Sequence, residues 1–210
     1  MAGGTKRLPR AVREQQMLDA AVKVFSEHGF RDTSMDAIAA EAEISKPMLY
    51  LYYGSKEELF GATIARESGK FIDAMAVGFD PSLRQSEQAR TVVKEFLRFV
   101  DEHRQSWNML YRVAVGSASF SSIVRESRRQ VTDMITELIR RGTTVEGARD
   151  IDFELTAVAL VGAGEAVADR ISEGDVDLET ATDLLVGITW RGLKGVGVHG
   201  GAAPPAVGGN

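Results

Sequence analysis

Apolar side chains recur at intervals of three and four residues through most of the chain, which is the spacing of one face of an α-helix. The first such run predicts a helix that ends at Gly29, a residue suited to the left-handed backbone of a helix stop. Beyond residue 80 the same spacing predicts longer helices, separated by glycine and proline breakers. These helices are expected at 85–104, 106–117, 120–141, 151–173 and 177–195, with Gly174 among the breakers.

Two short helices joined by a tight turn are expected after Gly29. Either Thr33 or Ser34 can cap the first, and Ser45 can cap the second, where the missing N–H of Pro47 costs nothing. The second helix runs only from Lys46 to Tyr52. This pattern is typical of the helix-turn-helix, in which the second helix enters the major groove of DNA.

A further helix is expected from Lys56 onward. Ser55 stands at its N-cap position, and Glu58 is three residues later. A serine and a glutamate at this spacing form a capping box, in which each side chain accepts a hydrogen bond from a backbone N–H at the helix start.

Charge is distributed unevenly along the chain. The net charge is −5, yet residues 1–56 carry a balance of +1 and the remainder −6. Residues 1–12 therefore predict a basic, disordered arm that contacts phosphates, with a solvated tail as the alternative. The basic residues of the arm are Lys6, Arg7 and Arg10, and Arg13 follows it directly.

The sequence lacks the residues and motifs on which several classes of protein depend. The chain has no cysteine and only three scattered histidines, so we expect no disulfide, no metal site and no cofactor. Neither a Ser-His-acid arrangement nor a glycine-rich phosphate loop is present, which argues against an enzyme. The polar start and the lack of an apolar run of about 18 residues indicate a cytoplasmic protein that does not enter a membrane.

The segment MLDAAVKVFSEHGFRDTSMDAIAAEAEISKPMLYLYYGSKEELFGATI resembles the N-terminal domain of the TetR family of transcriptional repressors. The similarity covers about residues 13–64 and is most specific in the run S-K-P-x-L-Y-x-Y-Y-x-S-K-E-x-L. It implies an all-α homodimer that binds a palindromic operator in double-stranded DNA. A three-helix DNA-binding domain would occupy residues 13–55, a larger ligand-binding and dimerisation domain 56–196, and a disordered tail 197–210.

Matching positions in this family contact DNA. The resemblance implies phosphate contacts for one set of residues, namely Thr33, Ser34, Ser45, Tyr50, Tyr52 and Lys56. It implies a place near base edges for a second set, namely Lys46, Pro47, Met48 and Leu51. Three positions depart from the family pattern: Glu43 replaces a usual glycine, Leu51 a frequent tyrosine and Tyr52 a frequent histidine. The first departure costs about 1 kcal/mol if the backbone has a positive φ, and the other two leave the operator sequence unpredicted.

The second half is rich in apolar residues, most of which we expect to be core. Those in the middle helices are the candidates for lining a ligand cavity, namely Phe96, Val100, Trp107, Leu110, Tyr111 and Phe120. Gly162 and Gly164 suggest close helix approach, and with Trp190 they are candidates for the dimer interface. The alternative is close packing within one chain. The ending Trp190-Arg191-Gly192-Leu193 resembles the lipid-metabolism branch of the family, which favours a fatty acyl effector.

These features predict a one-component transcriptional repressor that leaves its operator when a small hydrophobic ligand binds. The alternative is a helical protein-interaction module without operator-specific DNA binding.

Overall fold

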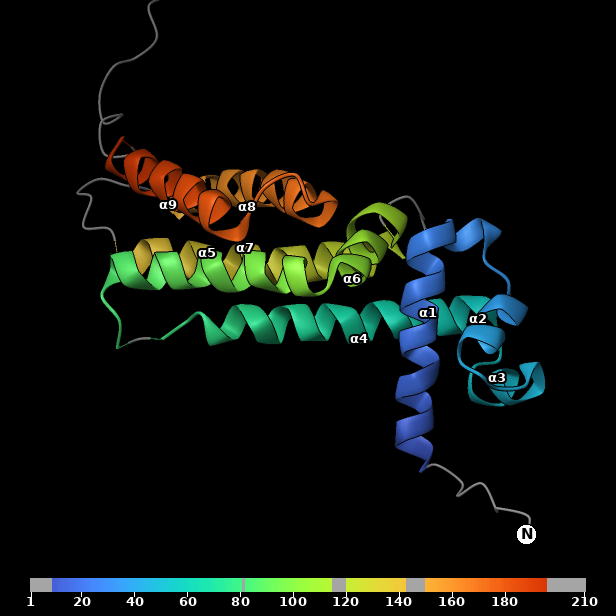
Figure 1. The fold of residues 1–210 in the computed structure, drawn as a ribbon. Coiled ribbons are helices and arrows are strands. Elements are labelled where there is room, and N and C mark those ends of the chain that lie inside the picture. Colours follow the sequence, from blue (N-terminus) through green and yellow to red (C-terminus); the bar gives the residue numbers. More distant parts are fainter. Residues whose placement is uncertain (1–8, 81, 115–119, 143–149, 196–210) are drawn as a thin grey trace, which may run out of the picture. The chain divides into compact units, whose positions relative to one another are not determined.

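The computed structural model describes residues 9–80, 82–114, 120–142 and 150–195, and every regular element in those ranges is a helix (Figure 1). The predicted all-α class is therefore confirmed. The chain forms two compact units, Met1–Ala74 with Phe99–Arg128 and Met75–Arg98 with Arg129–Asn210. The elements are α1 (Arg10–Asp32), α2 (Met35–Glu41), α3 (Lys46–Tyr52), α4 (Lys56–Val77), α5 (Gln85–Glu102), α6 (Arg104–Asn108), the π-helix η1 (Met109–Ala114), α7 (Ser121–Gly142), α8 (Asp150–Glu173) and α9 (Leu178–Gly195).

Helix α1 is interrupted close to its end. Gly29 has φ 74° and ψ 173°, a backbone conformation that glycine adopts without steric cost. The predicted stop at Gly29 is thus a break in the helix, although the helix continues to Asp32 after it. At the other end α1 begins at Arg10, so the last residues of the predicted basic arm are helical. Residues 1–8 of that arm lie outside the described residues.

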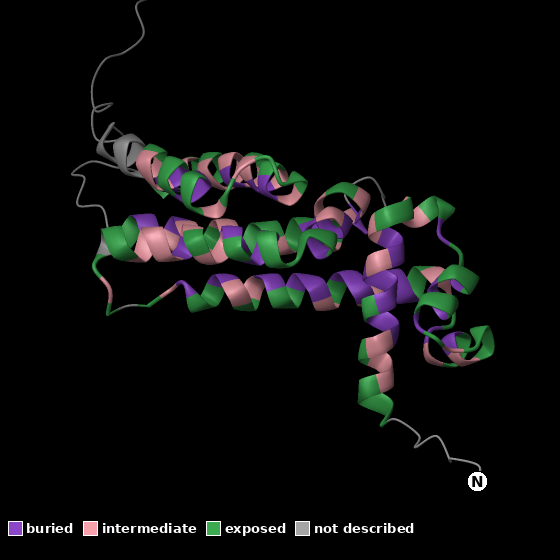
Figure 2. Ribbon diagram, in the orientation of Figure 1, coloured by how far each residue is buried: buried purple, intermediate pink, exposed green. Residues whose placement is uncertain are grey.

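A hydrophobic core joins α1, α2, α3, the beginning of α4 and η1 in the first unit, where Figure 2 shows buried helix faces. Aromatic rings form its centre. The centroids of Phe25 and Phe60 are 4.6 Å apart, and Phe60 lies 4.8 Å from Phe120. This core explains why the unit does not stop at the domain boundary predicted between residues 55 and 56. The beginning of α4, together with Met109 and Leu110 of η1, packs with α1, α2 and α3.

The helix predicted at 106–117 takes a different form. It begins earlier as α6 and then widens into η1, whose hydrogen bonds span five residues instead of four. Met109 and Ala114 are five residues apart and both fully buried, which the wider turn allows. At the junction the rings of Trp107 and Tyr111 stack with centroids 3.8 Å apart. Residues 115–117 of the predicted helix lie outside the described part.

The second unit is a set of long helices. Helix α8 packs against α7 through Ile139, Phe153 and Ala157, and α8 also contacts α9. Arg90 of α5 donates hydrogen bonds to Glu179 and Asp183 of α9. These four helices are the ones predicted at 85–104, 120–141, 151–173 and 177–195, with ends that agree within two residues.

The end of α8 follows its sequence signal. Gly174 has φ 81°, and Asp175 N–H donates to the carbonyl of Arg170 at 3.0 Å, which is the usual pattern of a glycine helix stop. The predicted breaker is confirmed. Within the described ranges, no helix combines the length and the apolar character needed to cross a bilayer. The predicted tail 197–210 lies outside those ranges.

Candidate nucleic-acid interface

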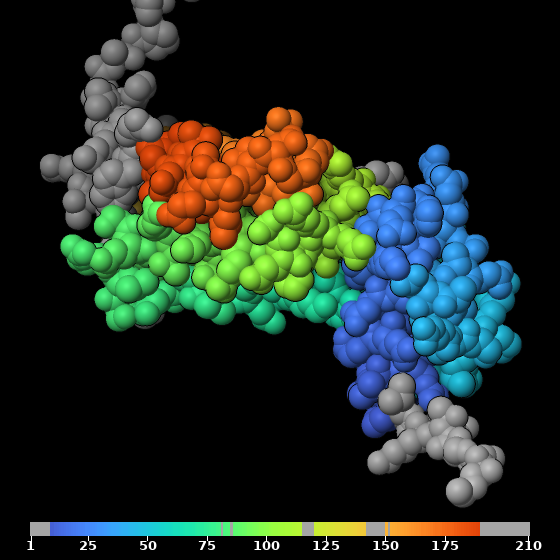
Figure 3. Space-filling model, viewed as in Figure 1, coloured from blue at the N-terminus to red at the C-terminus, as the bar shows by residue number. Residues whose placement is uncertain are grey.

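Helices α2 and α3 form a helix-turn-helix held by its own small core. Ile38, Ala39 and Leu49 are buried between the helices and α1. The turn that joins them contains Glu43 with φ 52°, the positive value expected where a glycine is usual. In the space-filling view the lighter blue surface of α2 and α3 lies beside α1 (Figure 3). The pair is therefore fixed as one rigid element.

The caps of the short helices agree only partly with the sequence predictions. Ala37 N–H donates to the Ser34 hydroxyl at 3.1 Å, which makes Ser34 the N-cap of α2. Glu58 N–H likewise donates to Ser55 at 3.1 Å, and the Glu58 carboxylate accepts from Gly54 N–H at 2.9 Å. Ser45 occupies the N-cap position of α3, but its side chain makes no capping hydrogen bond. Its hydroxyl is thus not engaged in the cap.

The outer face of α3 faces solvent. Leu51 is 79% exposed and Tyr50 44% exposed, whereas Leu49, which precedes them, is fully buried. Pro47 is also exposed, while Met48 and Tyr52 are half-buried against the core of the first unit. Helix α3 therefore presents a narrow face with few polar atoms.

Lys46 begins α3 and is already paired. Its Nζ donates to the Asp36 carboxylate of α2 at 2.7 Å. This hydrogen bond, followed by the charge of Asp36, raises the pKa of Lys46 above its ordinary value. Before the lysine can contact a base edge or a phosphate, the pair with Asp36 has to open or share its donor.

Thr33 and Lys56 direct their polar groups inward. Thr33 is 3% exposed, and its hydroxyl donates to the Gly29 carbonyl at 2.6 Å. The Lys56 ammonium donates to the carbonyls of Phe30 and Thr33, both at 2.8 Å, and to that of Arg31 at 3.2 Å. In this structure both side chains satisfy the carbonyls around the end of α1, so a phosphate contact from either requires a rearrangement.

Two arginines of α1 lie beside α3, the second helix of the helix-turn-helix, which we call the reading helix. The Arg10 guanidinium stands 5.4 Å from the centroid of the Tyr52 ring. Arg13 Nη1 lies 3.9 Å from the Met48 sulfur. These contacts bring two cations to the edge of α3. From the sequence, these two arginines could be recognised only as part of a basic N-terminal stretch, and their position beside α3 could not be predicted.

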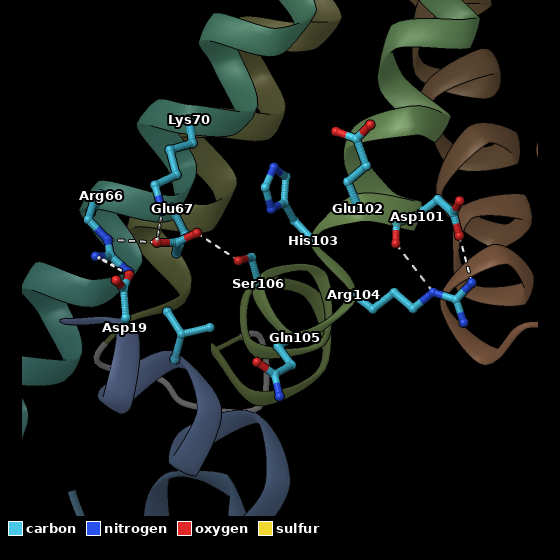
Figure 4. A pocket seen from close by; sticks show the side chains of 11 residues that line it. Asp19, Arg66, Glu67, Lys70, Asp101, Glu102, His103, Arg104, Gln105 and Ser106 are labelled. Atoms are coloured by element: carbon cyan, nitrogen blue, oxygen red, sulfur yellow. Dashed lines mark hydrogen bonds and ion pairs between the residues drawn. The ribbon is translucent and has the colours of Figure 1, made fainter. Parts of the chain in front are cut away.

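A charge network around the buried Glu67 joins α1, α4 and α6 of the same unit (Figure 4). Glu67 of α4 is 1% exposed and accepts from Arg66 Nε at 2.7 Å, Lys70 Nζ at 3.0 Å and Ser106 Oγ at 2.7 Å. Arg66 also pairs with Asp19 of α1 at 2.8 Å. Burial alone would raise the pKa of Glu67, but the hydrogen bonds from Ser106 and Lys70 and the charge of Arg66 outweigh it and lower the pKa.

This network lines a polar cavity of about 410 Å³. The remaining lining residues come largely from the end of α5 and from α6. No local sequence pattern could have revealed the network, because its members are up to 87 positions apart, from Asp19 to Ser106.

The six ligand candidates are placed in different surroundings. Trp107, Leu110 and Val100 are almost completely buried, and Phe120 belongs to the aromatic core of the first unit. None of the six lines a second cavity, of about 540 Å³, within the second unit. That cavity is formed by the segment after α4 and by α5 and α7, and its apolar lining residues are Phe79, Met134 and Leu138.

The three candidates for the dimer interface have different surroundings in the structure. A Cβ atom added to Gly162 would meet nothing within 4 Å, but one added to Gly164 would lie 3.3 Å from Phe96 Cε1. Gly164 thus lies against Phe96 of its own chain. Trp190 lies on α9, and its side chain falls outside the described part. Four large apolar side chains on α8 and α9 are about half exposed, namely Leu155, Val158, Leu184 and Ile188.

Two family models match the chain. The model described as bacterial regulatory proteins, tetR family, matches residues 17–63. The model described as tetracyclin repressor-like, C-terminal domain, matches residues 85–192. The first spans α2, α3 and most of α1, and the second spans α5 to most of α9.

Relatives support the same assignment. The HTH-type transcriptional activator FasR of Mycolicibacterium smegmatis is 29% identical over 201 residues, which is 93% of this chain and 90% of that protein. A TetR-like transcriptional regulator from Rhodococcus sp. RHA1 has a solved structure with 56% identity and a TM-score of 0.81, covering 90% of this chain and all of that one. The regulator FadR from Bacillus subtilis in complex with stearoyl-CoA shares the fold at 18% identity, with a TM-score of 0.68 and coverage of 83% and 96%.

Proposed function

Because the chain belongs to the TetR family of transcriptional regulators, we propose that it binds a palindromic operator as a homodimer and represses transcription until a small apolar effector releases it. The observation that carries this proposal is the exposed outer face of α3, with Pro47, Tyr50 and Leu51 in solvent above the buried Leu49. A short exposed helix at the end of a helix-turn-helix fits the width of the major groove.

Phosphate contacts are assigned to groups that are accessible around α3. The exposed Ser34 and Ser45, with Tyr50, can donate hydrogen bonds, and Arg10 and Arg13 supply positive charge beside the helix. Such contacts set the position of a protein on the duplex without reading its sequence.

The dimer interface is assigned to α8 and α9. Leu155 and Val158 on α8 and Leu184 and Ile188 on α9 expose apolar surface that a second copy would cover, and Gly162 leaves open space on α8. A twofold interface uses the same patch on both protomers. It would set the two copies of α3 about 34–36 Å apart, the repeat of the major groove.

The effector is assigned to the class of fatty acyl compounds. FadR from Bacillus subtilis has been solved in complex with stearoyl-CoA. The second unit of this chain contains a cavity with apolar walls from Phe79, Met134 and Leu138, lined also by Gln88, Asp133, Glu137 and Arg141. The six middle-helix candidates, among them the half-buried Phe96 on α5, do not line this cavity, and they remain a separate proposed set of contacts for an acyl chain. The proposed activity is non-catalytic and takes place on chromosomal DNA in the cytoplasm.

DNA binding can be tested by titrating the full-length chain against duplex DNA from upstream of its own gene, with random-sequence duplex as competitor. We expect a complex that resists the competitor and a footprint with twofold symmetry. Tyr50→Glu should abolish the complex because it adds negative charge to the exposed face. Val77→Glu, a matched change at an exposed position on α4, should leave it intact. Equal binding to both duplexes would favour the protein-interaction alternative.

The effector can be tested with stearoyl-CoA, using free coenzyme A as its matched control. We expect only the acylated compound to weaken the operator complex. A change produced equally by both compounds would place recognition in the coenzyme instead of the acyl chain. The absence of any change would remove fatty acyl compounds from the proposal.

A further inference from the structure

Resting on the proposed DNA-binding function, we propose that α3 selects its operator mainly by apolar contact with thymine methyl groups, through Leu51 supported by Pro47. Specificity would then come from the C5-methyl of thymine, which is the apolar feature of the major groove.

Leu51 has no structural use in the described chain. It is 79% exposed on a seven-residue helix whose other leucine, Leu49, already fills the core. Pro47 stands four residues before Leu51, so both side chains lie on one face of α3. Neither side chain can form a hydrogen bond with a base edge.

The polar side chains of α3 are less suited to reading bases. Lys46 is held by Asp36 at 2.7 Å. Tyr52 is half-buried and lies under Arg10, and the Met48 sulfur lies beside Arg13. Tyr50 carries a hydroxyl but is assigned to the backbone of DNA. The central part of the reading face is therefore apolar.

The size of the effect follows from the area that a methyl group buries. Removing one buried methyl-sized group from a contact changes affinity by about fourfold. A palindromic site presents each contact twice, so one symmetric pair of thymines should account for about fifteenfold. A hydrogen-bonding side chain would show no such dependence on the methyl group.

The test is uracil substitution, which removes the C5-methyl and preserves base pairing. Duplexes are first selected from a random library with the full-length wild-type chain. Each thymine of the recovered half-sites is then replaced by uracil in both half-sites, and affinity is measured for the wild type, Leu51→Ala and the conservative variant Leu51→Met. Circular dichroism melting confirms that the variants fold.

We expect at least one thymine pair at which uracil weakens the wild type by about fifteenfold and Leu51→Met by a similar factor. The same replacement should change the affinity of Leu51→Ala by less than about twofold. Uracil effects that are absent from the wild type, or equal in Leu51→Ala, overturn the inference while DNA binding stands. If no sequence is enriched by the selection, the proposed function fails and this inference fails with it.

Discussion

At the scale of single residues, Asp36 decides how much charge α3 offers to DNA. Because its carboxylate holds Lys46 at 2.7 Å, Asp36→Asn should free the lysine for a phosphate. We expect tighter DNA binding and a dependence of log K on log[salt] that is steeper by about 0.9 for each subunit. Fluorescence anisotropy over a series of KCl concentrations measures both quantities.

The control for this variant is Glu41→Gln. Glu41 makes an equally short pair with Lys23, which is not part of α3. If Glu41→Gln changes the salt dependence as much as Asp36→Asn does, the effect comes from net charge and Lys46 gains no contact.

Glu67 links stability to pH. Its pKa is lowered in the folded chain. The stability that the carboxylate supplies is therefore fully present at pH values above the pKa of glutamate in the unfolded chain, about 4.3. This stability is lost as the pH falls through the pKa of the folded chain. Glu67→Gln should lower the free energy of unfolding at pH 7 by about 3 kcal/mol, since it leaves Arg66 and Lys70 without their shared carboxylate. This difference should shrink in strongly acidic buffer.

Urea unfolding at several pH values checks this prediction. Asp101→Asn is the matched control, because Asp101 lines the same cavity but is exposed, as is its partner Arg104. It should cost less than about 1 kcal/mol. A Glu67→Gln deficit that is the same at pH 7 and pH 3 would mean that the side chain stabilises by packing alone.

At the scale of helices, two glycines of α8 should respond in opposite ways. Gly164→Leu should lower the free energy of unfolding by about 1–3 kcal/mol, because its side chain would meet Phe96. Gly162→Leu enters open space and should leave protomer stability intact while weakening dimerisation. Sedimentation equilibrium and urea unfolding at low protein concentration separate these outcomes. An unchanged dimer in Gly162→Leu would move the interface away from this part of α8.

Helix positions could be predicted from the sequence because each depends on residues close together in the chain. The apolar spacing predicted α5, α7, α8 and α9, and local signals predicted the Gly174 stop and a cap at either Thr33 or Ser34, of which Ser34 forms it. Side-chain partners far apart in sequence could not be predicted. Lys56 turns toward Phe30 and Thr33, and Gly164 faces Phe96, because tertiary packing decides these directions.

The wider turn of η1 also escaped prediction. Its sequence, MLYRVA, has the spacing of an ordinary amphipathic helix. Burial of both Met109 and Ala114 in the first unit, together with stacking of Trp107 on Tyr111, depends on contacts with other helices. Local periodicity carries no information about such contacts.

At the scale of the whole molecule, operator and effector should oppose each other by the same factor. Helix α4 starts directly after the reading helix and, like α5 and α7, contributes residues to both compact units, which makes it a covalent route between the proposed sites. If stearoyl-CoA weakens operator binding tenfold, about 1.4 kcal/mol, the operator must weaken stearoyl-CoA binding tenfold. Calorimetric titration of stearoyl-CoA with and without operator measures the second factor. Unequal factors would mean that the effector acts on a species other than the operator-bound dimer.

The ion pair between Lys46 and Asp36 also bears on how quickly a regulator finds its target. Random chromosomal sequence attracts a protein through phosphate charge alone, and here the first cation of the reading helix is already neutralised within a chain of net charge −5. Complexes with random sequence should therefore be short-lived. The protein should locate its operator mainly by repeated dissociation and rebinding, with little sliding along the DNA. Occupancy of the operator is then set by the ratio of specific to random binding, so weaker binding to random sequence leaves a larger share of the copies available for the operator.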